Sequence, residues 1–353
     1  MEKKVLVIDD SALMRRVLSD IINKDKLLTA GKAAENGKEA LEMILQGEKF
    51  DILLVDINMP KMNGVQFLKE LNKYRIHIPV LIVSSIASES ANETIEALAL
   101  GAFDFVKKPN GSVGYEMEDF RRQLLLRIYL ACGLRVDSAE ESKEEVRSHL
   151  PRKRIKRAKG HDRTLVVIAS STGGPRALQS VLPYFPMDFP YPVVVIQHMP
   201  AGFTDSLAKR LDVMSPLHVK EAEDGEIIQA GNVYIAQGGK QCELIERGKG
   251  TFVLSETDKP ARGGLRPCAD IFLESLPDTS LERCVCGVLT GMGADGCKGL
   301  QYAKQYKEIK VVAQNEETCV VYGMPRAVAK AGIVNEVVPL DEVANAMIKQ
   351  LGV

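Results

Sequence analysis

The sequence predicts two α/β domains, each built on a parallel sheet that helices cover on both sides. Three observations support this prediction. The chain has 353 residues, and single domains usually hold about 100–200 residues. In both halves, short apolar runs alternate with amphipathic stretches, an order typical of parallel strands joined by helical crossovers. A highly charged stretch separates the two halves.

The first domain is predicted over residues 1–130. Its first helix is predicted to begin after Ser11, because a serine hydroxyl can accept a hydrogen bond from the free N–H groups of a first helical turn. The apolar side chains that follow Ser11 recur on one helical face. The other elements are strands at 5–8, 52–55, 80–83 and 103–106 and helices at 37–46, 64–73 and 88–100.

Residues 131–163 are predicted to form a charged linker. Five acidic residues within 137–145 are followed by eight basic residues within 147–163, and apolar periodicity nearly disappears. The run RKRIKR also resembles a nucleic-acid or targeting patch. We favour a solvated linker, because 46 Lys and Arg are balanced by 47 Asp and Glu and no second basic surface accompanies the run.

The second domain is predicted over residues 164–353 and is expected to be Rossmann-like. Between residues 215 and 260 the spacing shortens to VYIA, CELIE and TFVLS with turn residues between them, which predicts an antiparallel insert or edge. The other elements are strands at 165–169, 192–196, 284–289 and 309–312 and helices at 174–182, 202–213, 294–305 and 323–331.

Composition and cysteine usage predict a cytoplasmic protein. Hydrophobic residues make up 45% and charged residues 26% of the chain, values typical of globular domains. No apolar run approaches the roughly 20 residues that cross a bilayer, and the N-terminus begins with a strand pattern rather than a signal peptide. The seven irregularly spaced cysteines indicate reduced thiols. Cys284 and Cys286 are expected to be structural, because no His or second Cys pair offers metal-ligand spacing.

Acidic and cationic side chains follow the predicted strands of the first domain. Asp9 and Asp10 end the first strand, and Asp56 ends the strand at 52–55. The carboxyl ends of parallel strands share one edge of the sheet, so three carboxylates would repel one another there without a divalent cation. Oxygen ligands favour Mg²⁺. Ser84 and Lys108 follow two further strands, and such a set can transfer a phosphoryl group to a carboxylate.

Three strand ends of the second domain carry a serine, a histidine and an aspartate. Ser171 lies in TLVVIASSTGGPRAL, between a strand and a helix whose free N–H groups can hold an oxyanion. His198 follows the strand of VVVIQHMPAGF, and Asp295 lies in the glycine-rich turn of CVCGVLTGMGADG. At one edge of a sheet these residues would form a triad, in which His198 takes the Ser171 proton and Asp295 orients the imidazole.

The STGG run alone leaves other interpretations open. A helix cap is the ordinary role of a hydroxyl at this position. A phosphate-binding loop is another, although the run lacks G-x-G-x-x-G and the lysine of G-x-x-x-x-G-K-[ST]. Ser170 is a second candidate hydroxyl, and Ser171 is preferred because it directly precedes Thr-Gly-Gly.

The motifs DD, DINMP, VSS and KKP, each at a predicted strand end, make residues 1–125 resemble a response-regulator receiver domain with a flavodoxin-like fold. The resemblance implies that Asp56 accepts a phosphoryl group and that Ser84 and Lys108 contact it. Phe105 stands where the family often places a switching aromatic residue. The implied Mg²⁺ ligands are Asp9, Asp10 and Asp56.

The runs STGG, QHMP and LTGMGADG resemble the catalytic domain of the chemotaxis protein-glutamate methylesterases, from about residue 164 to 350. This family implies Ser171 as nucleophile, His198 as base and Asp295 as orienting acid. Thr172 and Met292 also lie in family motifs and are expected to shape the site or its oxyanion hole. The family hydrolyses glutamate γ-methyl esters on chemoreceptors without a cofactor, releases methanol, and often deamidates selected receptor glutamines.

One segment departs from the family pattern. GGLRPCADIF stands where members commonly show His-Arg-Pro-Ser-Val-Asp, so Leu265 replaces the histidine and Cys268 the serine. We expect this segment to lie outside the triad and to affect substrate contacts more than chemistry.

Together the two resemblances imply a phosphorylation-controlled esterase of chemotactic adaptation, whose receiver covers Ser171 until Asp56 is phosphorylated. The expected partners are methyl-accepting chemotaxis receptors as substrate and a chemotaxis histidine kinase as phosphodonor, with no nucleic acid and no membrane insertion. Mg²⁺ is expected for phosphorylation alone. An inert, receptor-binding esterase-like domain stays open. A transcription factor is disfavoured, because no helix-turn-helix or basic recognition helix follows the linker.

Overall fold

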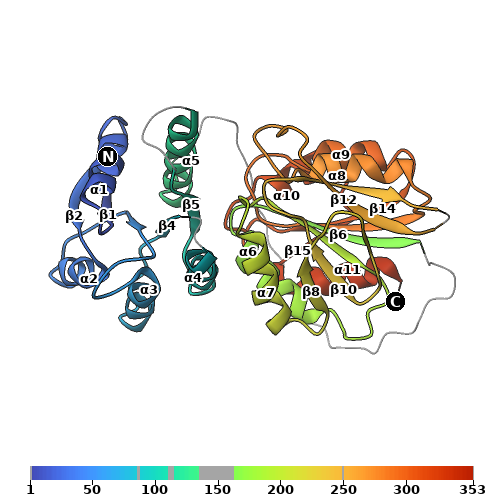
Figure 1. Cartoon of the computed structure of the whole chain (residues 1–353), viewed down its shortest axis with the longest axis horizontal. Helices are drawn as coiled ribbons and strands as arrows, with labels where there is room; N and C mark the ends of the chain where they lie inside the picture. The colour runs from blue at the N-terminus through green and yellow to red at the C-terminus, as the bar shows by residue number, and fades with distance from the viewer. Residues whose placement is uncertain (1, 86–87, 110–114, 135–162, 249, 353) are drawn as a thin grey trace.

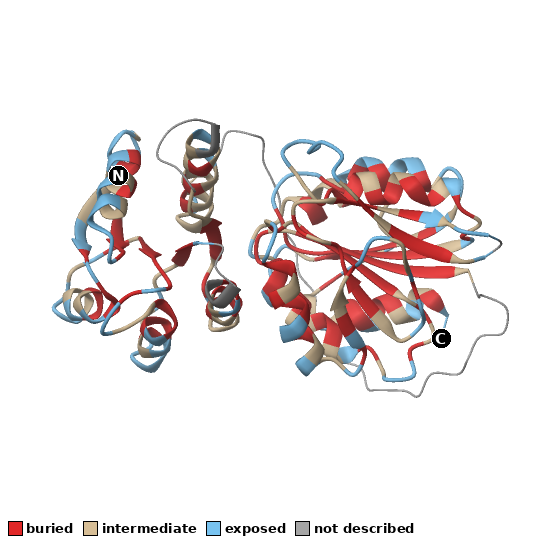
Figure 2. Ribbon diagram, in the orientation of Figure 1, coloured by how far each residue is buried: buried red, intermediate tan, exposed pale blue. Residues whose placement is uncertain are grey.

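The computed structural model (Figure 1) describes residues 2–85, 88–109, 115–134, 163–248 and 250–352 and consists of two α/β domains. Helices lie on both sides of each central sheet, and most strand residues are buried (Figure 2). The predicted fold class is therefore confirmed. Most of the predicted linker, including RKRIKR, lies outside the described residues.

The first domain is a five-stranded parallel sheet with the order β2-β1-β3-β4-β5. Side chains alternate along β1, so Leu6 and Ile8 pack on the side of α2, α3 and α4, whereas Val5 and Val7 pack on that of α1 and α5. The strands are β1 (Lys3–Ile8), β2 (Leu28–Ala34), β3 (Ile52–Val55), β4 (Val80–Ser84) and β5 (Asp104–Lys107). The helices are α1 (Ala12–Asn23), α2 (Gly37–Leu45), α3 (Gly64–Lys73), α4 (Ser88–Ala99) and α5 (Tyr115–Ala131).

Local sequence explains most boundaries of this domain. Ser11 caps α1 as predicted, and its Oγ accepts a hydrogen bond from the N–H of Met14 at 3.3 Å. The strand β2 was not predicted, because its sequence LTAGKAA is rich in small and polar residues. An edge strand that pairs only with β1 is half exposed, so it needs no continuous apolar run.

The second domain has a seven-stranded parallel sheet, β15-β14-β13-β6-β7-β10-β8, and a small antiparallel sheet, β11-β12-β9. Its parallel strands are β6 (Thr164–Ser170), β7 (Val193–Gln197), β8 (His218–Glu221), β10 (Asn232–Ile235), β13 (Arg283–Val288), β14 (Glu308–Gln314) and β15 (Glu336–Val338). The antiparallel ones are β9 (Glu226–Ile227), β11 (Gln241–Glu246) and β12 (Phe252–Thr257). The α-helices are α6 (Gly174–Val181), α7 (Thr204–Met214), α8 (Ala269–Ser275), α9 (Cys297–Ala303), α10 (Met324–Lys330) and α11 (Val343–Leu351).

The order of these strands creates a switch point beside β6. The chain first moves from β6 to β7 and then returns to the opposite side of β6 with β13. Crossovers therefore leave β6 in both directions, and the carboxyl ends of β13, β6 and β7 open onto the same crevice.

The expectation for residues 215–260 was partly wrong. CELIE and TFVLS do form the antiparallel pair β11 and β12, but VYIA belongs to β10, which pairs in parallel with β7 and β8. Val233, Tyr234 and Ile235 are all buried, as expected of a strand inside a covered parallel sheet.

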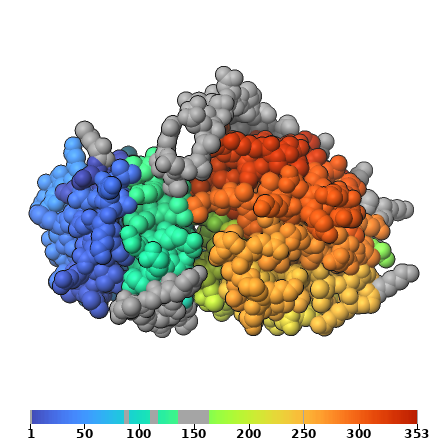
Figure 3. All heavy atoms as spheres, turned by 90° about the horizontal axis from the view of Figure 1, so that it is seen from above, coloured from blue at the N-terminus to red at the C-terminus, as the bar shows by residue number. Residues whose placement is uncertain are grey.

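The two domains pack directly against each other (Figure 3). The rings of Phe105 in β5 and Phe203 before α7 have centroids 4.8 Å apart. The helix α4 contacts α6 and α7, and one cluster of buried apolar residues continues from the first domain into the second. In the described ranges we find no helix with both the length and the hydropathy of a membrane span.

A buried carboxyl group in β12 should make stability depend on pH. Burial raises the pKa of Glu256 to about 7, although the N–H of Gln237 donates to its Oε1 at 3.2 Å. Because the folded-state pKa lies above the ordinary 4.5, the stabilisation by the neutral form is complete below pH 4.5 and is lost as the pH rises through 7. We expect Glu256→Gln to raise the free energy of unfolding at pH 8 by at most about 3 kcal/mol and to change it little at pH 4.5.

Urea unfolding at the two pH values measures this difference. Glu316→Gln, which changes an exposed carboxylate, is the matched control. It should change the free energy of unfolding little at either pH. An equal effect of Glu256→Gln at pH 4.5 and pH 8 would show that the Glu256 carboxyl does not titrate on unfolding.

Candidate functional site

Three carboxylates meet at the carboxyl ends of β1 and β3 in the first domain. One oxygen from each of Asp9, Asp10 and Asp56 lies within 4.8 Å of the others. The Lys108 Nζ lies 2.8 Å from Asp9 Oδ2 and 2.9 Å from Asp56 Oδ1. Carboxylate oxygens are hard ligands, so this donor set fits a small divalent cation such as Mg²⁺.

Burial and charge set the protonation of this cluster. Burial, together with the neighbouring Asp9, raises the pKa of Asp56 to about 6, while Lys108 opposes the rise. Burial by itself would lower the pKa of Lys108, but Asp56 and Asp9 outweigh it and hold that pKa above its usual value. Lys108 therefore stays cationic at neutral pH, beside the Asp9 and Asp56 carboxyl groups.

Ser84 is the last residue of β4 and is fully buried. Its Oγ accepts a hydrogen bond from Thr94 Oγ1 in α4 at 3.0 Å. This hydrogen bond connects Ser84, at the end of β4, to α4, which packs against the second domain. A displacement of the Ser84 hydroxyl would therefore break or shift a contact of α4.

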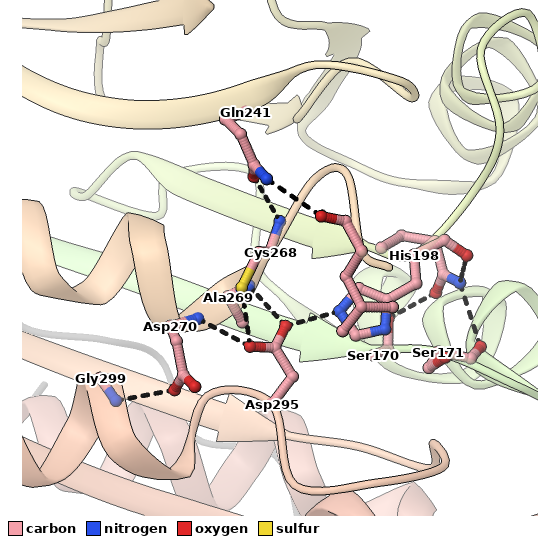
Figure 4. Close-up of polar contacts among 11 residues, drawn as sticks. Ser170, Ser171, His198, Gln241, Cys268, Ala269, Asp270, Asp295 and Gly299 are labelled. Carbon is pink, nitrogen blue, oxygen red and sulfur yellow. Dashed lines mark hydrogen bonds and ion pairs between the residues drawn. The ribbon is translucent and has the colours of Figure 1, made fainter. Parts of the chain in front are cut away.

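Figure 4 shows the second constellation, at the switch point of the larger sheet. His198 Nε2 lies 2.7 Å from Asp295 Oδ2, and the two side chains come from the turns after β7 and β13. The N–H groups of Ala269 and Asp270 donate to Asp295 at 2.6 and 3.0 Å, and the Cys268 thiol lies 3.0 Å from Oδ1. The carboxylate is therefore held in one orientation by backbone and side-chain donors.

These donors decide the charge of Asp295. Burial by itself would raise its pKa, but His198, Cys268 and the Asp270 N–H outweigh burial and lower the pKa to about 2. The carboxylate is therefore ionised at neutral pH and can accept a hydrogen bond from the His198 tautomer that carries its proton on Nε2. The other nitrogen, His198 Nδ1, is buried and has no hydrogen-bond partner in the described part of the chain. In this tautomer Nδ1 is free to accept a proton.

The two adjacent serines have different surroundings. Ser170 is 0% exposed, and its Oγ donates to Gln197 Oε1 at 2.6 Å. Ser171 is partly exposed, and its backbone N–H donates to Thr290 O at 3.0 Å. The turn that follows requires a left-handed residue, and Gly173 has a φ of +77°. Only Ser171 of this pair therefore presents its hydroxyl at the crevice.

A cavity of about 500 Å³ lies over this crevice, between the two domains. Ser171, Thr172, His198 and Met292 line it from the second domain, and β5 and α5 line it from the first. A cavity of this size holds a side chain or a small ligand, but the first domain occupies the approach to it. The predicted Thr172 and Met292 thus lie at the same cavity as Ser171 and His198.

The segment GGLRPCADIF lies closer to the site than expected. Leu265 lines the cavity, and Cys268 and the first two residues of α8 contact Asp295. Sequence reasoning also overlooked Gln197, whose amide contacts the backbone of both Ser171 and His198. The position of Gln197 directly before His198 was visible, but the convergence of these groups depends on pairing between distant strands.

Comparisons with known proteins agree with both domains. The chain matches the family CheB methylesterase over residues 166–347 and the response regulator receiver domain over residues 5–113. A Geobacillus kaustophilus protein named protein-glutamate methylesterase/protein-glutamine glutaminase is 42% identical over 351 residues, covering 99% of each chain. A Bacillus subtilis protein of the same name is 40% identical, covering 97% of this chain and 96% of its own.

A solved structure matches the second domain. The CheB methylesterase catalytic domain of Thermotoga maritima is 42% identical, with a TM-score of 0.51, and covers 53% of this chain and 97% of its own. The full-length identity and the family match together leave one conclusion: this chain belongs to the CheB methylesterase family and carries a response regulator receiver domain in front of the family's catalytic region.

Proposed function

We propose that this protein hydrolyses glutamate γ-methyl esters on methyl-accepting chemoreceptors, releases methanol, and is activated by phosphorylation of its receiver domain. The observation that carries the proposal is that Ser171 and His198 line one cavity while His198 pairs with Asp295 behind it. The names of the relatives supply the substrate and extend the proposal to deamidation of receptor glutamines.

The geometry supports an acyl-transfer mechanism. His198 Nδ1 takes the proton of Ser171 Oγ as that oxygen attacks the ester carbonyl carbon, and Asp295 stabilises the imidazolium through Nε2–H. The imidazolium then returns the proton to the departing methoxide, so methanol leaves and an acyl-serine remains. Water, deprotonated by His198, attacks the acyl carbon; the bond to Ser171 Oγ breaks, His198 returns the proton to that oxygen, and a glutamate leaves. Thr172 and Met292 are assigned to shaping the oxyanion site.

The receiver is proposed to control access to this cavity. Asp56 attacks the phosphoryl group of the donor, and Lys108 neutralises phosphate oxygens. Mg²⁺, when bound by Asp9, Asp10 and Asp56, supplies further neutralisation of the transferred group. Because the receiver lines the cavity over Ser171, a rearrangement that loosens its contact would admit a receptor.

Residues 1–130 are taken as the receiver, 131–163 as a linker and 164–353 as the catalytic domain. A chemotaxis histidine kinase is the proposed phosphodonor, with no nucleic-acid partner. A cytoplasmic location is proposed because all seven cysteines are unpaired, as in reducing compartments.

Methanol release from a methylated chemoreceptor, with Mg²⁺ and with or without a small phosphodonor, tests the proposal. A coupling free energy of the usual size predicts that the phosphodonor raises the rate roughly 5- to 150-fold. Asp56→Asn should bring the ratio of stimulated to basal rate down to about 1, because the amide cannot accept the phosphoryl group. Release without stimulation would contradict the switch, and no release by the folded protein would favour an inert binding domain.

A further inference from the structure

Gln197, the last residue of β7, connects the segments that carry Ser171 and His198. Its side-chain Nε2 donates to the carbonyl oxygen of Ser171 at 3.0 Å and to that of His198 at 3.1 Å. These carbonyls belong to two different turns, one after β6 and one after β7. One buried amide group, 1% exposed, therefore holds both turns.

The orientation of this amide is determined by its neighbours. The Oε1 atom faces the Ser170 hydroxyl at 2.6 Å, and the Nε2 atom faces two carbonyl oxygens. Carbonyls can only accept hydrogen bonds, so a flipped amide would place oxygen against oxygen. The two carbonyls thus orient the Gln197 amide, and the buried Ser170 hydroxyl satisfies its Oε1.

The space for this amide comes from the second glycine of the STGG run. A Cβ atom on Gly174 would lie 2.0 Å from Gln197 Oε1 and 2.9 Å from the Ser170 Cβ. Any larger residue would displace the amide. The residues Ser170, Gly174 and Gln197 therefore form one packed unit behind the serine and the histidine, and we call it the amide brace.

We propose that Gln197 is a positioning residue, which acts through the backbone of Ser171 and His198 to set the distance between nucleophile and base. This inference rests on the proposed esterase activity. A displacement of about 1 Å between reacting groups can lower a rate by roughly 100-fold. Loss of the brace should therefore lower kcat rather than raise KM, since the Gln197 amide is 1% exposed and its polar atoms are occupied by Ser170 and the two turns.

The test is Gln197→Glu in the full-length protein. Glutamate has the same shape and can still accept from Ser170, but its carboxylate cannot donate to either carbonyl. We expect kcat for methanol release to fall roughly 10- to 100-fold, with KM within twofold of the wild type. Labelling of Ser171 by a fluorophosphonate, measured per folded molecule, should slow by a similar factor.

Asn335→Asp is the matched control, because it makes the same amide-to-acid change on an exposed side chain whose oxygen accepts from the Val311 N–H. It should leave kcat and the labelling rate unchanged. A folded Gln197→Glu protein with wild-type kcat and labelling would overturn the proposal, as would a loss that matches a lower folded fraction.

If Gln197→Glu does not fold, Ser170→Ala provides the test, because it removes only the hydroxyl that donates to the Gln197 Oε1 and so loosens the amide. We expect roughly two- to fivefold slower labelling of Ser171, and an unchanged rate would overturn the proposal.

The wild-type protein tests the proposed function separately from the role of Gln197. A folded wild-type chain that neither releases methanol nor reacts at Ser171 would contradict the proposed function itself, whereas activity retained by both variants contradicts only the role of Gln197.

Discussion

Replacement of Ser171 by alanine is expected to lower kcat for methanol release by roughly 10⁴-fold or more, because no acyl-enzyme can form without its Oγ. The substitution removes one partly exposed oxygen from the cavity wall, so the thermal midpoint should change little. Methanol release from a methylated chemoreceptor and the thermal midpoint of the same preparation measure the two effects. Binding of the receptor should persist, since the cavity keeps its shape.

Two serine controls make this result specific. Ser180→Ala, on the partly exposed surface of α6, should leave kcat unchanged. Ser170→Ala should lower kcat only a few-fold, because the Ser170 hydroxyl is buried against Gln197 and does not reach the cavity. If Ser170→Ala abolished turnover while Ser171→Ala retained it, the nucleophile would be the other serine.

Asp295→Asn is expected to lower kcat by about 10⁴-fold, a loss like that seen when a triad aspartate becomes an amide. The Asp270 N–H donates to Oδ1 and the Ala269 N–H to Oδ2, the oxygen that faces His198, so an asparagine amide keeps only one of these two bonds. An NH₂ group directed at His198 Nε2 would favour the tautomer that carries its proton on Nδ1. That nitrogen could then no longer accept the Ser171 proton.

Measurement of kcat and of the thermal midpoint at pH 7 tests this reasoning. Asp278→Asn, an exposed change at the end of the helical segment that follows α8, is the matched control and should leave kcat at the wild-type value. A folded Asp295→Asn protein with more than a tenth of wild-type kcat would show that the carboxylate does not control the imidazole.

Periodicity and strand-end position in the sequence were sufficient for the fold class and for most elements. The strand at 52–55 and the helix at 64–73 were predicted at their observed bounds, because each is an apolar run or an amphipathic stretch that polar turns delimit. The strand ends were informative for a physical reason. Parallel strands present their carboxyl ends at one edge, so Asp9 and Asp56 could be placed together from their positions alone.

The sequence was a poorer guide wherever pairing with distant segments decides the outcome. The edge strand β2 lacks an apolar run, and VYIA was assigned to an antiparallel insert although it pairs in parallel with β7. Neither the register nor the neighbour of a strand is written in its own few residues, because both are selected by what packs against its two faces.

The sequence by itself determined which chemistry is present: carboxylates and a lysine at one sheet edge, and Ser171, His198 and Asp295 at another. Only the tertiary structure decided how these groups are held. It showed that Nε2 of His198, rather than Nδ1, faces Asp295, that Cys268 and α8 orient this carboxylate, and that Gln197 joins two turns. Hydrogen-bond direction and the choice between two adjacent hydroxyls depend on atoms brought together from distant strands, and local residue patterns do not contain that information.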